Sequence, residues 1–63
     1  MGITSEEFRN RRRAMGLTQE ALARRLDITL RAVTLIEAKP EVPERYVLAL
    51  TAIEAERIGG ETA

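Results

Sequence analysis

The 63-residue chain contains no cysteine, histidine or tryptophan, and only one tyrosine and one phenylalanine. Without cysteine or histidine it cannot form a disulfide, a zinc site of the usual kind, a thiol nucleophile or an imidazole acid–base pair. The remaining hydroxyls and carboxylates are scattered and form no catalytic constellation. We therefore expect no enzyme, no metal site and no other cofactor, and a reducing cytoplasmic compartment.

Long apolar runs are missing as well. No stretch approaches the roughly 18 to 20 residues of a transmembrane helix, and the N-terminus lacks the basic and then apolar pattern of a secretory signal. We expect no membrane association, and a single small domain over residues 1–63. A domain of this size buries only about 60 % of the surface that its unfolded chain exposes, so oligomerisation is an expected supplement to its core. No small-molecule ligand is expected.

Charge is balanced overall, with ten basic and ten acidic residues, but it is distributed unevenly. Residues 9–39 carry eight basic and three acidic side chains, whereas residues 1–8 have a net charge of −2 and residues 40–63 of −3. Such asymmetry favours a basic face that binds nucleic acid, with acidic surface elsewhere limiting indiscriminate binding. A solvated mixture of charges is the alternative explanation.

Glycine and proline divide the chain into helix-length segments, with breaks at Gly16, at Pro40 and Pro43, and at the Gly59-Gly60 pair. No β-type alternation of useful length appears. The expected fold is therefore all-α, with four helices. We place them at about residues 5–15, 18–26, 29–38 and 43–58.

Threonine and serine residues stand where helix N-caps are expected. Thr4 or Ser5 can cap the first helix, Thr18 the second and Thr29 the third. Within the helices, apolar residues recur at spacings that place them on one face. The expected inward positions are Phe8, Met15, Ala21, Leu22, Leu26, Val33, Ile36, Tyr46, Val47, Leu50 and Ile53.

The last expected helix has a second apolar stripe, formed by Leu48, Ala52 and Ala55 at spacings of four and three residues. A helix that is apolar on two faces needs two partners, and we interpret this stripe as a homodimer interface. Alternatively, the alanines are ordinary helix formers and Leu48 is a single exposed apolar residue.

Residues 18–37 form two expected helices joined by a short turn, which is a helix-turn-helix pattern. The steep crossing of such helices needs a small residue, which Ala23 supplies, and Ile28 can plug the turn. The segment resembles the lambda-repressor-like, Cro and xenobiotic-response-element class of DNA-binding domains over about residues 6–53. The matching residues are Gly16, Leu17, Thr18, Gln19, Glu20, Leu22, Ala23, Leu26, Thr29, Val33, Ile36, Glu37, Pro43 and Glu44.

This resemblance implies double-stranded DNA as the partner, with the third helix in the major groove and the start of the second on the phosphate backbone. It also implies that Arg12 pairs with Glu37 to join the first helix to the third, and that Arg12 can face a phosphate. Arg9 and Arg13 are further phosphate candidates. The implied DNA-binding residues are Arg12, Thr18, Gln19, Thr29, Leu30, Arg31, Thr34, Leu35 and Lys39.

Physical chemistry favours Arg31 as the main reader of sequence. A guanidinium can bond to guanine O6 and N7 together, which is worth about 1–3 kcal/mol of discrimination. Leu30 and Leu35 cannot form hydrogen bonds but can lie against thymine methyl groups, so we expect a G adjacent to a T in each half-site. A protein contact is the alternative role for these two leucines.

The sequence also departs from the family pattern. Asp27 stands where a left-handed glycine is common, and it tolerates that conformation better than most residues do. Arg11 occupies a position that is usually leucine, which shrinks a small core. The loop from Ala38 to Val42 is short and lacks glycine, so few backbone contacts to DNA are expected there.

The function that these features predict is sequence-specific regulation of transcription. We expect a homodimeric repressor that reads an inverted repeat and controls its own phage-type or mobile-element operon, governed by protein concentration and not by an inducer. The alternative is the DNA-binding part of an antitoxin, or an interaction module that depends on a protein partner.

Overall fold

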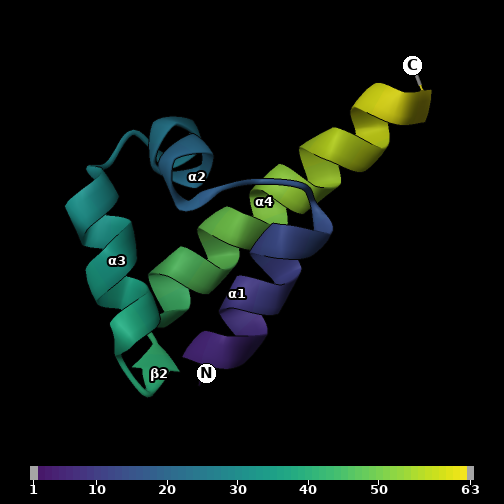
Figure 1. The fold of residues 1–63 in the computed structure, drawn as a ribbon. Helices are drawn as coiled ribbons and strands as arrows, with labels where there is room; N and C mark the ends of the chain where they lie inside the picture. The colour runs from purple at the N-terminus through teal and green to yellow at the C-terminus, as the bar shows by residue number, and fades with distance from the viewer. Residues whose placement is uncertain (1, 63) are drawn as a thin grey trace.

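The computed structural model describes the backbone of residues 2–62 and the side chains of residues 2–56. Four helices pack around one core, and a minimal two-stranded sheet lies beside the N-terminus (Figure 1). The helices are α1 (Ser5–Ala14), α2 (Gln19–Leu26), α3 (Leu30–Ala38) and α4 (Glu44–Thr62), and the strands are β1 (Ile3–Thr4) and β2 (Glu41–Val42).

The expected threonine caps determine where the first three helices begin. The hydroxyl oxygen of Thr4 accepts a hydrogen bond from the amide of Glu7 at 3.1 Å, so Thr4 and not Ser5 caps α1. Thr18 caps α2 and Thr29 caps α3 in the same way, at 3.0 and 3.1 Å. Each cap satisfies an amide that the first turn of the helix leaves without a partner.

Left-handed residues form the two turns that flank α2. Gly16 has φ +73° and separates α1 from α2. Asp27, with φ 57° and ψ 44°, ends α2 in the left-handed region that glycine usually occupies in this turn. The prediction that Asp27 adopts this conformation is confirmed.

The C-terminal end of α4 differs from the prediction. The helix continues through the Gly59-Gly60 pair to Thr62, so the expected end near Ile58 is wrong. Glycine lowers helix propensity by about 1 kcal/mol relative to alanine but does not forbid the conformation.

The sheet was not expected either. Ile3 pairs with Val42 and Thr4 with Glu41 in antiparallel register, and strands of two residues are too short to produce a recognisable alternation. Gly2 approaches this sheet closely, because a Cβ atom placed on it would lie 2.2 Å from the carbonyl oxygen of Val42. The pairing attaches the N-terminal segment to the loop that follows α3.

The core contains most of the expected residues. Phe8, Leu22, Val33 and Leu50 are fully buried, and so is Val42 of β2, which was not expected in the core. Ala23 is buried, and Ile28 packs against the core from the turn between α2 and α3. These positions fix the crossing of the two helices, on which the geometry of the site depends.

Arg11, at a position where the family pattern usually has leucine, joins α1 to α4. Its Nε donates to Glu54 Oε2 at 3.0 Å, its Nη2 donates to Thr51 Oγ1 at 3.1 Å, and its Nη2 also pairs with Glu54 Oε1. The hydrogen bond from Arg11 lowers the pKa of the Glu54 carboxyl below its ordinary value. A polar clamp thus replaces the missing leucine.

Candidate nucleic-acid interface

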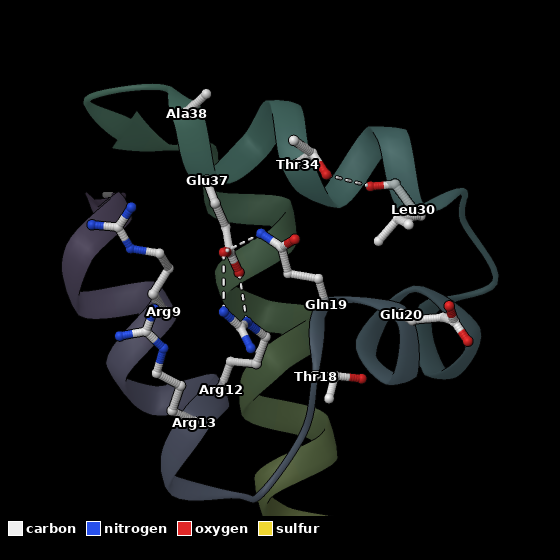
Figure 2. Close-up of a pocket in the computed structure, with 10 residues that line it drawn as sticks. All are labelled: Arg9, Arg12, Arg13, Thr18, Gln19, Glu20, Leu30, Thr34, Glu37 and Ala38. Atoms are coloured by element: carbon white, nitrogen blue, oxygen red, sulfur yellow. Dashed lines mark hydrogen bonds and ion pairs between the residues drawn. The ribbon is translucent and has the colours of Figure 1, made fainter.

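The helices α1, α2 and α3 meet around an open cleft of about 760 Å³. Figure 2 shows its lining, which comes from one side of α1, the first turn of α2 and one side of α3. The lining residues are Arg9, Arg12, Arg13, Thr18, Gln19, Glu20, Leu30, Thr34, Glu37 and Ala38.

A buried ion pair lies in the middle of this cleft. Arg12 Nε and Nη2 donate to the two carboxylate oxygens of Glu37 at 2.8 and 3.2 Å, and Arg12 Nη1 donates to the carbonyl of Leu17 at 2.8 Å. The side chains of Arg12 and Glu37 are only 7 % and 2 % exposed. The expected pairing of α1 with α3 is therefore confirmed, and these bonds leave Arg12 little surface toward a phosphate.

Gln19 completes this network from α2. Its Nε2 donates to Glu37 Oε1 at 2.9 Å, which ties the first turn of α2 to the last turn of α3 (Figure 2). The sequence pattern gave no sign of this bond, since Gln19 and Glu37 are 18 residues apart. The bond fixes the side chain beside the exposed face of α3.

The free charge of the cleft is positive. Arg12 and Glu37 neutralise each other. Glu20 points away from the centre (Figure 2) and pairs with Arg24 at 3.1 Å. Arg9 and Arg13 therefore give the cleft its positive charge.

The outer face of α3 borders the cleft. It carries Leu30, which is 45 % exposed, Leu35, which is 53 % exposed, and the exposed side chains of Arg31 and Thr34. The Thr34 hydroxyl donates to the carbonyl oxygen of Leu30 at 3.0 Å. Large exposed leucines on a helix beside a cationic cleft form an amphipathic contact surface.

The helix-turn-helix family model matches residues 8–54. The chain belongs to the helix-turn-helix family, in its lambda-repressor-like class. Comparison with curated proteins and with solved structures gives no match. The family is one of DNA-binding regulators, so this helix-turn-helix protein is a DNA-binding regulator.

In this helix-turn-helix protein, α2 and α3 are the two helices of the motif, and α3 is its second helix. Thr18 and Thr29 stand exposed at the N-termini of these helices, and Lys39 stands exposed just after α3. The expected site residues thus lie at the cleft or on α3 and its ends, with Arg12 buried beneath them.

The expected dimer residues lie on α4, outside the lining of the cleft. Leu48 is 61 % exposed, and Ala52 and Ala55 are also exposed.

Across the described residues, the helices lack the combination of length and apolar character that crossing a bilayer requires.

Proposed function

We propose that this helix-turn-helix protein is a sequence-specific transcriptional regulator that inserts α3 into the major groove. The observation that carries the proposal is the exposed face of α3 beside a cleft whose free charges are Arg9 and Arg13. Base edges and phosphates lie side by side in DNA, and helix-turn-helix proteins place the start of their second helix on the base edges. The cationic cleft then meets the adjoining phosphates.

Sequence preference is assigned first to Arg31. Its guanidinium is exposed at the start of α3 and can bond to O6 and N7 of one guanine. Leu30, Thr34 and Leu35 line the rest of the face that enters the groove. Replacing Arg31 by alanine should weaken binding by about 1–3 kcal/mol and relax the preference at one base pair per half-site.

Phosphate binding is assigned to the side chains around this face. Arg9, Arg13 and Lys39 supply charge, and Thr18, Gln19 and Thr29 supply hydrogen-bonding groups at the helix N-termini. Arg12 acts through Glu37 and Gln19, and is therefore a positioning residue. Replacing Gln19 by alanine should weaken binding with little change in sequence preference.

The proposed active form is a homodimer joined through Leu48, Ala52 and Ala55 of α4. Supporting this, the three side chains are exposed while Leu50 and Ile53 of the same helix are buried, and small residues let two helices approach closely. Two copies can place two α3 helices in successive major grooves, about 34 Å apart, and so read an inverted repeat.

The proposed role is repression, by occupying a promoter in the cytoplasm and blocking polymerase. Control of its own phage-type or mobile-element operon, set by protein concentration, fits a compact binding domain. The exposed face of α4 also suits the alternative, an antitoxin or other module whose α4 binds a different chain.

The deciding experiment is a selection from a randomised duplex pool at about 0.15 M salt, with sequencing of the bound fraction. Enrichment of an inverted repeat supports the dimeric regulator. Enrichment of a single half-site would support sequence-specific binding without the dimer, whereas no enrichment with a folded protein would favour the partner-dependent module.

The dimer itself is tested by replacing both Leu48 and Ala52 with glutamate. Four carboxylates would then face one another across the proposed interface, so sedimentation should show a helical monomer with most of the affinity for the operator lost. A double variant that stays dimeric would place the interface elsewhere.

A further inference from the structure

The outer face of α3 has little capacity to donate hydrogen bonds. Leu30, Leu35 and Ala38 have no polar side-chain group, and all three are exposed. The one hydroxyl hydrogen on this face, that of Thr34, is used within the helix, in the 3.0 Å bond to the Leu30 carbonyl. Within α3, Arg31 is the only exposed side chain that offers donors to a base.

This distribution determines which groups in the major groove the face can recognise. Guanine presents two acceptors there, and adenine and cytosine each present an amino donor, whereas the apolar group is the methyl at C5 of thymine. Two half-exposed leucines gain most from covering an apolar group, because that removes both surfaces from water. The oxygen of Thr34 can still accept a hydrogen bond from an amino group.

From this arrangement we infer that α3 reads the methyl group at C5 of pyrimidines, and therefore distinguishes 5-methylcytosine from cytosine as it distinguishes thymine from uracil. Thymine and 5-methylcytosine carry the same methyl at the same ring position, and they differ at position 4, where one has an acceptor and the other an amino donor. A leucine side chain has no hydrogen-bonding group and so does not distinguish the acceptor from the donor at position 4. The inference depends on the proposed insertion of α3 into the major groove.

The location of the leucines indicates that DNA, and not a protein, covers them. Leu30 lines the same cleft as Arg9 and Arg13, and Leu35 is one helical turn beyond Arg31 on α3. A protein that covered this face would have to accommodate these cations, while a DNA groove has phosphates at its edges.

The test uses the duplex enriched by the selection, made in matched pairs. One pair carries thymine or deoxyuridine at the pyrimidines that face the leucines, and the other carries 5-methylcytosine or cytosine paired with guanine. Burial of one methylene-sized group predicts a Kd about fourfold lower per methyl, and so about fifteen-fold lower for two symmetric positions. The Kd values are measured by fluorescence anisotropy.

Variants distinguish the contribution of the leucines to methyl recognition from that of the other residues on the face. Leu35→Ala and Leu30→Ala should each remove the methyl dependence at one position, with circular dichroism confirming that the helices remain. Arg31→Ala should weaken binding to both members of each pair and leave their ratio intact, because the guanidinium reads a different base.

Equal Kd values within both pairs would overturn methyl recognition while leaving DNA binding in place. A pyrimidine position whose methyl dependence persists in both leucine variants would also overturn it, since another group would then read the methyl there. Failure to bind any duplex would overturn the proposed function together with this inference, and would indicate a protein that covers the leucines.

Discussion

Glu37 and Arg12 form a two-point ion pair between α3 and α1, with N–O distances of 2.8 and 3.2 Å. Both side chains are almost completely buried, and the carboxylate also accepts a hydrogen bond from Gln19. In a domain with so small a core, one polar network therefore sets the positions of three helices. It holds α3 against the cationic side of α1.

Replacing Glu37 alone by leucine should destabilise the fold severely. The guanidinium of Arg12 would stay buried without its counter-charge, which costs about 3–5 kcal/mol, as much as a core of this size supplies. We expect the variant to be largely unfolded by circular dichroism at 25 °C.

The matched control is the double variant with leucine at both positions 12 and 37. Replacing a buried ion pair by apolar residues is often neutral, so the double variant should recover most of the urea resistance of the native chain. If the single and double variants unfold at the same urea concentration, the ion pair does not have the energetic role assigned to it.

Replacing Asp27 by glycine should stabilise the protein by about 0.5–1 kcal/mol. Asp27 is left-handed, with φ 57°, and its negative charge lies at the C-terminus of α2, where the helix dipole disfavours it. Glycine removes both costs. It also raises the conformational entropy of the unfolded chain, which offsets part of the gain. Thermal unfolding should show a midpoint several degrees higher, and Asp27→Ala, which keeps a Cβ, should lower it.

Local signals made most of the fold predictable. Thr18, Thr29, Gly16 and Asp27 each determine a helix end through contacts within a few residues, so the sequence pattern suffices for the motif. The sequence did not predict the end of α4, because the Gly59-Gly60 pair lowers helix stability only modestly and does not end the helix.

Contacts between distant residues were not predictable. Arg11 reaches Glu54 across 43 residues, and nothing in the spacing of either residue indicates the other. The same holds for the pairing of Ile3 with Val42 and for the bond from Gln19 to Glu37. The Arg12–Glu37 pair was expected only because the family pattern supplies both residues together.

Acid should weaken the Arg11–Glu54 clamp. The pKa of Glu54 is lowered in the folded protein by the hydrogen bond from Arg11, so its contribution is present above the ordinary pKa of glutamate and is lost as pH falls through the lowered value. The pair is partly exposed, which limits the effect to about 1 kcal/mol or less.

The measurement is the free energy of unfolding in urea between pH 7 and pH 3. Glu54→Gln should be slightly less stable than the native chain at pH 7 and should approach it at low pH. If the difference in unfolding free energy between Glu54→Gln and the native chain is independent of pH, the clamp is not the source of the sensitivity to acid.

The salt dependence of operator binding should report the charged side chains of the cleft. With Arg12 occupied by Glu37, the free cations assigned to phosphates are Arg9, Arg13 and Lys39, which makes six in a dimer. The logarithm of affinity should then fall with the logarithm of salt concentration at a slope of about −5. Arg13→Ala removes two of the six and should reduce the slope to about −3.6.

Arg25→Ala is the matched control for this experiment. Arg25 lies on α2, faces Glu56 of α4 at 3.8 Å and does not line the cleft. Its loss should leave the slope unchanged. A native slope shallower than about −2 would mean that no more than about two phosphates are neutralised. The two clefts of a dimer offer four cations, Arg9 and Arg13 of each copy, so the two clefts would not both meet the DNA backbone.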